Sequence, residues 1–274
     1  MPKLSNLRAY LPFFHAGYRQ SLAYQGNFLI YRLADATFAL VAYFLWRAVF
    51  SSSTSPNLGG FTLPEMIIYV FLSFYLATLT SSWASGNIGQ EIKDGSIAMR
   101  LLKPVNYSLT YFFEEIGAKL MQVAFMTVIL LGGIVIFQLT HPHVLAFHLG
   151  NFLLFVMSSL LAYLISYYFD LCFGFTAFIF QNLWGANNMK STIVNFFSGS
   201  LIPLAFFPPL VASIFSFLPF ASLIYTPIMI YLGRYNPQQL TLSLVLQVFW
   251  TLFFYVLSKI IWRAVIGHLT VQGG

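Results

Sequence analysis

Long apolar runs separated by short polar segments dominate the sequence. A helix that crosses the hydrocarbon core of a bilayer needs about 20 apolar residues, and charges and turn residues cut the runs into pieces of roughly that length. The pattern predicts six membrane spans, over residues 28–50, 61–83, 107–139, 149–183, 190–207 and 240–262. A straight helix over the fourth would rise about 52 Å against a core of about 30 Å. This segment must therefore tilt, bend near Gly174, protrude into the cytoplasm or comprise two segments.

The chain before the first span has a different pattern. Apolar residues recur there at helical spacing, while charged and imidazole side chains lie on another side of the same helix. The apolar set is Leu4, Leu7, Leu11, Phe14, Tyr18 and Leu22, and the polar set is Arg8, His15 and Arg19. Residues 1–27 are therefore predicted to form an amphipathic helix along the cytoplasmic membrane surface.

Between the fifth and sixth spans, prolines interrupt an otherwise apolar segment, residues 208–239. Its two apolar runs, 210–218 and 220–232, are each shorter than a full crossing. Short apolar pieces separated by proline are typical of helices that dip into one leaflet and return. The alternative is one additional irregular span.

Composition supports a membrane protein. Hydrophobic residues make up 59% of the chain and charged residues 7%, against about 25% charged in an ordinary soluble domain. The mean hydropathy of +0.78 excludes a soluble globule, and disordered, collagen-like and coiled-coil chains are excluded because they need polar or repetitive sequences. Cys172 is the one cysteine, so an internal disulfide is excluded. The fold class predicted is an all-α membrane protein.

The positive charges indicate orientation. The loops after spans two, four and six carry Lys93, Arg100, Lys103, Lys190 and Arg263, whereas residues 51–60 and 140–148 contain no Lys or Arg. Cytoplasmic loops are enriched in Lys and Arg, so both termini are predicted to be cytoplasmic. The net charge of +6 is spread between apolar runs and forms no basic stripe, which argues against a nucleic-acid partner.

One loop, residues 86–107, holds five of the 20 charged residues, interleaved with isoleucine and leucine. A charged segment with regularly placed apolar residues can form a short surface helix, and Gly95 and Pro104 would delimit it. Such a helix can dock on a cytoplasmic partner. A solvated loop that only anchors orientation is an equal alternative.

Charges inside the spans are expensive in lipid and usually face protein or water. Arg32 and Asp35 lie three residues apart, and Glu115 and Lys119 lie four apart, so each pair shares a helix face. Mutual neutralisation with snorkelling to the cytoplasmic surface is favoured over a gating role. Asp170 has no sequence neighbour of opposite charge. It is expected to pack against a basic residue of another span or to lie close to the cytoplasmic interface.

Catalytic and metal-binding motifs are missing from the sequence. His141, His143 and His148 cluster in one predicted outer loop, but no nearby carboxylate or thiolate completes a zinc site, so a solvated loop is favoured. The chain contains no GxSxG, HExxH or GxxxxGK[ST] sequence. We therefore expect neither an enzyme nor a nucleotide site.

Two groups of residues resemble the permease subunits of type-2 ABC exporters. The first, in the loop after the second span, is Ile92, Gly95, Ile97, Leu101, Leu102 and Pro104. The second resembles that class's fifth span and outer re-entrant helices and comprises Ser198, Gly199, Ile202, Pro203, Phe206, Phe207, Pro208, Pro219, Phe220 and Pro227. The resemblance implies one transmembrane domain, 1–274, in which 1–27 is the connecting helix, 86–107 the coupling loop and 208–239 the re-entrant segment.

The resemblance also implies a function. The chain would form half of an export pathway for a hydrophobic or amphipathic substrate in the bacterial plasma membrane, paired with an identical or homologous permease. Two cytoplasmic ATP-binding subunits would carry ATP and Mg²⁺, and this chain would hold no cofactor. The residues expected to couple to the ATPase are Ile88, Glu91, Ile92, Lys93, Asp94, Gly95, Ile97, Arg100, Leu101, Leu102 and Pro104.

Three other functions stay open on the sequence alone. An ATP-independent carrier or lipid scramblase would transport without a partner, and an internal repeat would favour it. An intramembrane enzyme acting on lipid would need polar residues that converge within the bilayer. A binding or assembly subunit would not transport at all.

Overall fold

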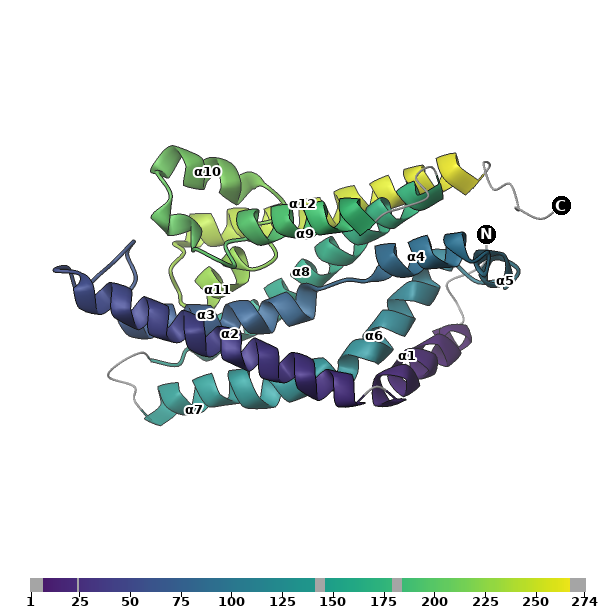
Figure 1. The fold of residues 1–274 in the computed structure, drawn as a ribbon. Helices are drawn as coiled ribbons and strands as arrows, with labels where there is room; N and C mark the ends of the chain where they lie inside the picture. Colours follow the sequence, from purple (N-terminus) through teal and green to yellow (C-terminus); the bar gives the residue numbers. More distant parts are fainter. Residues whose placement is uncertain (1–6, 24, 141–145, 179–183, 267–274) are drawn as a thin grey trace.

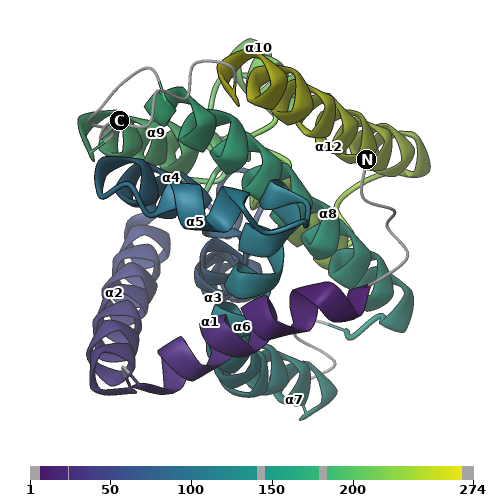
Figure 2. The ribbon, with the colours of Figure 1, turned by 90° about the vertical axis from the view of Figure 1, so that its right-hand side faces the viewer.

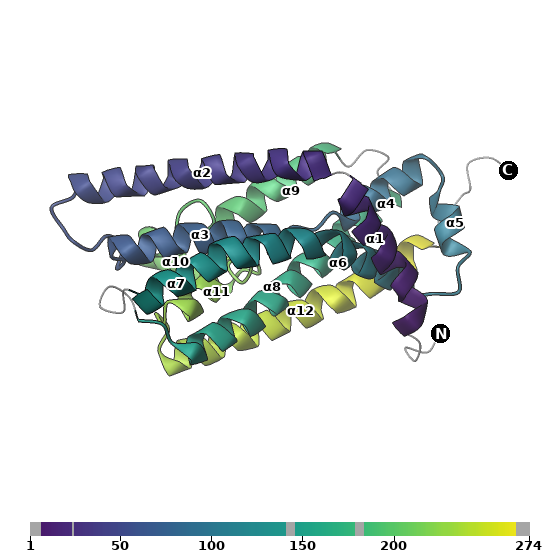
Figure 3. The same ribbon diagram turned by 90° about the horizontal axis from the view of Figure 1, so that it is seen from below.

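The protein is almost entirely helical, as the apolar pattern predicts. A computed structural model describes residues 7–23, 25–140, 146–178 and 184–266, of which 82% are helical and none forms a strand. The long helices run in broadly the same direction, side by side (Figures 1 and 3). The all-α fold class is confirmed.

Five segments of the described chain are long and apolar enough to cross a membrane: Leu33–Ser52, Leu63–Lys93, Tyr107–Thr140, Leu149–Phe178 and Pro237–Val265. The first lies in α2 (Gln25–Ser52), and the second comprises α3 (Leu63–Thr80) and α4 (Ala84–Lys93). The third comprises α6 (Tyr107–Met126), a π-helical turn (Thr127–Leu131) and α7 (Gly132–Thr140). The fourth contains α8 (Leu149–Phe175) and a 3₁₀ turn, η3 (Thr176–Phe178), and the fifth is α12 (Pro237–Val265).

The predicted boundaries of the span over 190–207 are wrong. The helix there, α9, covers Trp184–Phe197, and its 14 residues rise about 21 Å, less than the hydrocarbon core. A turn follows the helix at Gly199, which has a φ of +79°, and the carbonyl of Gly199 accepts a hydrogen bond of 2.7 Å from the Tyr69 hydroxyl of α3. A short 3₁₀ turn, η4 (Leu204–Phe206), follows. A count of six spans stays a prediction.

At one end of the bundle lies the amino-terminal helix. The 3₁₀ turn η1 (Leu7–Tyr10) leads into α1 (Leu11–Ala23), which crosses α6 at a steep angle (Figures 2 and 3). The crossing is close because both helices carry a glycine there: a Cβ on Gly17 would overlap the carbonyl of Glu114, and one on Gly117 would overlap that of Phe14. The backbones of α1 and α6 are thus in direct contact.

Two short helices occupy the predicted re-entrant segment at the opposite end (Figure 1). They are α10 (Pro209–Phe217) and α11 (Tyr225–Tyr231), and neither is long enough to cross a bilayer. Pro208 and Pro203 precede α10 and η4 as their N-terminal caps, Pro219 lies between α10 and α11, and Pro227 is buried within α11. All seven residues of α11 are buried, whereas none of α10 is.

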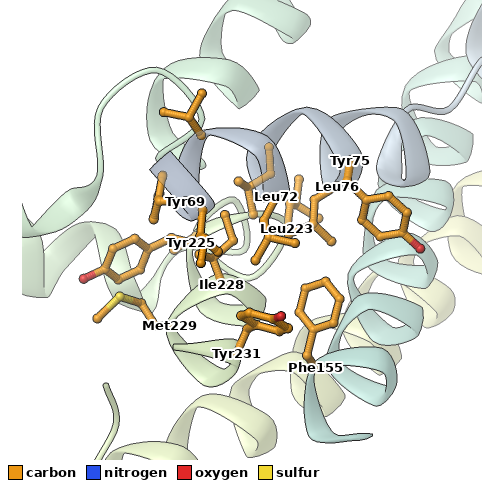
Figure 4. Close-up of a cluster of buried hydrophobic side chains, with 14 of the residues drawn as sticks. Tyr69, Leu72, Tyr75, Leu76, Phe155, Leu223, Tyr225, Ile228, Met229 and Tyr231 are labelled. Carbon is orange, nitrogen blue, oxygen red and sulfur yellow. The ribbon is translucent and has the colours of Figure 1, made fainter. Parts of the chain in front are cut away.

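The main hydrophobic core joins α3, α8 and α11. Leu72 and Leu76 of α3, together with Ile228 of α11, are fully buried, and Phe155 of α8 packs edge-on against Tyr231, with 5.3 Å between the ring centroids. Figure 4 shows these side chains converging from the three helices. The core therefore fixes α11 beneath α3, so the predicted re-entrant segment is anchored in the bundle through α11.

Candidate functional site

A break in the second predicted span is the first element of the site. Helix α3 ends at Thr80 and α4 begins at Ala84, so Ser81, Ser82 and Trp83 are not helical. A break of this kind leaves backbone groups without helical partners. Such groups are costly in a membrane interior, where no bulk water replaces the lost bonds.

Charged side chains of α6 supply the missing partners on one side of the break. Lys119 donates a hydrogen bond of 3.2 Å to the carbonyl of Leu79, while Glu115 accepts from the Ser82 hydroxyl at 2.9 Å and from the Trp83 N–H at 3.4 Å. Glu115 and Lys119 form the expected i,i+4 ion pair, at 3.0 Å. Because both are buried, Lys119 does not snorkel to the surface, and the pair instead holds α6 against the break.

Asp170 of α8 supplies partners on the other side. Its carboxylate accepts 2.8 Å hydrogen bonds from the N–H and the hydroxyl of Ser85, in the first turn of α4, and forms an ion pair with Lys190 of α9. A negative charge near the N-terminus of a helix is favourable. Lys190 also donates to Asn187, at 3.1 Å. The expectation that Asp170 packs against a basic residue of another segment is confirmed.

Helix α4 continues into the predicted coupling loop, which is folded. A turn with Gly95 at φ +76° joins α4 to α5 (Ile97–Leu101), at the same end of the bundle as α1 (Figures 1 and 2). The N–H and hydroxyl of Ser96 both donate to Asp94, which lowers the pKa of that carboxyl. The segment is thus helical, as one of the two sequence hypotheses predicts, but it forms two short helices where that hypothesis expected one.

Arg100 ties α5 to α4 and α6. Its guanidinium lies 2.6 Å from Glu91 and 2.9 Å from Glu114, and it stacks on the Tyr111 ring with 4.1 Å to the centroid. Burial alone would lower the pKa of Arg100, but Tyr111 and the two carboxylates raise it above its usual value. The guanidinium therefore stays charged and holds the two short helices as one unit.

The proposed coupling residues divide into an inner and an outer set. Ile88 and Ile97 are buried, and Ile92 and Leu101 pack against the same cluster. Ile88 approaches Gly174 of α8 closely enough that a Cβ on that glycine would lie 2.8 Å from its side chain. The exposed members are Lys93, Asp94, Gly95, Leu102 and Pro104. Met99, which the sequence reasoning missed, is 67% exposed, and Leu102 is 83% exposed.

A cavity of about 530 Å³ lies beside the helix break. Residues of α3, the break, α4, α8 and α9 line it, together with Leu223 and Ile224, and Asp170 and Lys190 form part of the wall. The polar residues of α9 that line it were not singled out from the sequence. Three asparagines in nine residues, Asn187, Asn188 and Asn195, lie just before and within the predicted span over 190–207, and this unusual concentration could have found them.

Other predicted residues lie away from this region. Asp35 is a half-buried residue of α2, whereas the side chain of Arg32, as well as His141 and His143, lies outside the described residues. On the opposite end of the bundle, Arg234 forms an ion pair with Glu65 of α3. Within the part of the chain that the structure describes, no group of three His, Cys, Asp or Glu residues could hold a metal ion.

Comparison with protein families identifies a family for this chain. The family model described as "ABC-2 family transporter protein" matches residues 36–273, which covers all five candidate spans except the first residues of the first. A comparison with curated proteins found no match.

Proposed function

The chain belongs to the ABC-2 family of transporter proteins, and from this premise we propose that it forms half of an ATP-driven export pathway for hydrophobic or amphipathic molecules. Membership makes it a multi-pass membrane component of a transporter, not itself catalytic, and implies association with ABC ATP-binding subunits. The proposal adds a substrate class, an outward direction, ATP and Mg²⁺ on two cytoplasmic partner subunits, and the bacterial plasma membrane as the location.

The exposed surface of the α4–α5 unit is the main observation that supports the proposal. It presents two exposed apolar side chains, Met99 and Leu102, beside the exposed Lys93 and Lys103. An apolar anchor with a charged rim is typical of a protein-binding surface. We propose that this surface docks on the ATP-binding subunit and that both chain termini lie on the same, cytoplasmic, side.

The polar contacts around the helix break support transmission of force from the α4–α5 unit to the rest of the bundle. Glu115 and Lys119 connect the break to α6, Asp170 connects α4 to α8, and Lys190 brings in α9. A force applied to the α4–α5 unit would therefore reach three helices, α6, α8 and α9, through short polar contacts. Closure of the ATPase dimer would move the unit as a rigid body and shift the permease from inward-facing to outward-facing.

The exposed surface of α9 supports pairing with a second permease. None of its described residues is buried, and four polar residues, Asn188, Ser191, Thr192 and Asn195, are exposed. Polar side chains on a membrane helix usually face protein or water because lipid offers no hydrogen bonds. A second copy or a homologous permease facing α9 would enclose them in a shared pathway.

Co-purification tests the docking surface. Leu102→Asp should remove an ATP-binding subunit that co-purifies with the wild-type complex, since a charge replaces the highly exposed apolar side chain that caps the C-terminus of α5. Leu102→Met, the matched control, should retain it. Equal recovery of the ATP-binding subunit with both variants would refute the docking role. Transport by the purified chain alone, without ATP, would instead favour a carrier or scramblase.

A further inference from the structure

We propose that the cavity beside the helix break binds the uncharged, hydrogen-bonding head group of an amphipathic molecule. This inference rests on the proposed function in one respect: the ligand is taken to be the transported substrate. The volume of about 530 Å³ lies within the range of small-molecule sites, about 300–1,000 Å³.

The walls of the cavity are chemically divided. Ala77, Phe169, Val194, Leu223 and Ile224 supply apolar surface, whereas α9 and the helix break supply amides and hydroxyls. An apolar surface next to a hydrogen-bonding one matches a ligand that has an alkyl portion and a polar portion. A purely apolar ligand would leave the polar wall without partners, which is costly away from bulk water.

The polar wall has unused hydrogen-bonding capacity. The side-chain amides of Asn188 and Asn195 and the hydroxyl of Ser166 line the cavity, and none of these three groups has a hydrogen-bond partner within the described part of the chain. Asn188 and Asn195 lie seven residues apart on α9, two helical turns along one face. Each amide offers both donors and acceptors, so together they suit a head group with several hydroxyl or amide groups.

The electrostatics of the cavity exclude a strongly charged head group. Among the described residues that line it, Asp170 and Lys190 are the ionisable ones, and they neutralise each other in an ion pair. Asp170 is also held by Ser85, and Lys190 by Asn187. A phosphate or ammonium group entering the cavity would find no free counter-charge and would lose its hydration. Head groups rich in hydroxyls and head groups rich in amides are both uncharged and form several hydrogen bonds, so both fit this cavity.

Protection from thiol labelling tests this inference on the full chain in lipid nanodiscs. Ala77→Cys, in a Cys172→Ala background, places a reporter thiol in the apolar wall. Four eight-carbon probes are compared at equal concentrations: octyl glucoside, octanoyl glycinamide, octyl phosphate and octyltrimethylammonium. We expect octyl glucoside, octanoyl glycinamide or both to slow maleimide labelling, and the two charged probes to have little effect. Which neutral probe protects distinguishes a hydroxyl from an amide head group.

Variants of the polar wall complete the test. Asn188→Leu and Asn195→Leu should raise the concentration needed for half protection on the order of tenfold, as expected for the loss of one or two hydrogen bonds. Thr241→Leu is the control, because Thr241 is an exposed polar residue of α12 outside the cavity wall. Protection by a charged probe equal to that by the neutral ones, no protection by any probe, or unchanged protection in the asparagine variants would each overturn the inference. Because labelling uses the chain without ATP-binding subunits, its outcome is independent of the co-purification result.

Discussion

Replacing Asp170 with asparagine should loosen the junction of α4 with α8 and α9. The carboxylate accepts two hydrogen bonds from Ser85 and pairs with Lys190, and an asparagine can satisfy only part of that set. The carboxamide also removes the negative charge that neutralises the ammonium. Asp170→Asn should therefore destabilise the whole chain as well as the helix break.

The expected loss of stability in Asp170→Asn follows from the burial of the ion pair. Removing one partner of a buried ion pair costs about 3–5 kcal/mol. The Lys190 side chain is 12% exposed and lines the cavity, so water can partly solvate the released ammonium, and we expect about 2–3 kcal/mol. At about 2–4 °C per kcal/mol for a chain of this size, the unfolding midpoint should fall by about 4–12 °C.

A double-mutant cycle tests whether the ion pair is the cause. Thermal unfolding of the purified full chain would be followed for Asp170→Asn, Lys190→Met and the double variant. In the double variant no charge is left unpaired, so its effect should be smaller than the sum of the two single effects by at least about 1 kcal/mol. Asp94→Asn is the matched control, because that carboxylate is exposed, and it should leave the midpoint nearly unchanged. Additive single effects would refute the reasoning.

Four further predictions concern contacts between helices. Gly17→Leu should destabilise the chain by about 2 kcal/mol or more, since any side chain there meets the α6 backbone; an unchanged unfolding midpoint would contradict the close crossing. Arg100→Met should abolish stimulation of the partner ATPase by substrate, and Arg100→Lys should restore it only in part, because lysine cannot bridge Glu91 and Glu114 as a guanidinium does. Because the pKa of Arg100 is raised, the charge of its guanidinium is lost only as the pH rises through that pKa, so wild-type ATPase stimulation measured between pH 7 and about pH 9 should show no loss caused by Arg100. Gln247→Leu should cost about 1–3 kcal/mol in the same unfolding measurement, since Ser158 and Ser222 would lose hydrogen bonds of 2.9 Å each; a neutral effect would contradict it.

The apolar pattern was sufficient to locate the five long spans because each is a nearly continuous apolar run. It misplaced the segment over 190–207 for a physical reason. Hydropathy records how apolar a stretch is, but the end of α9 depends on a positive φ at Gly199 and on a hydrogen bond from Tyr69, 130 residues away. A distant tertiary contact of this kind has no local signature.

In the candidate site, too, local sequence pattern predicted the segment but not its tertiary contacts. Charge density was enough to single out residues 86–107, yet only the fold shows that Ile88 and Ile97 face inward while Met99 and Leu102 face outward. The inward face of α4 is set by Gly174 of α8, far away in sequence. Lys190 could not be assigned to Asp170 from the sequence either, because the two residues lie on different helices, α9 and α8.

The glycine crossing of α1 and α6 has a mechanical consequence. Because Gly17 and Gly117 bring the two backbones into contact, no side-chain rearrangement can absorb a relative displacement of these helices. A tilt of α6 must carry α1 with it, and sideways pressure on α1 must in turn load α6. The sequence predicts that α1 lies along the cytoplasmic membrane surface, where lipid headgroups would exert such pressure. Bilayer tension and thickness would thereby act on the same helix whose Glu115 and Lys119 hold the break, making the surrounding lipid a second mechanical input to the transporter.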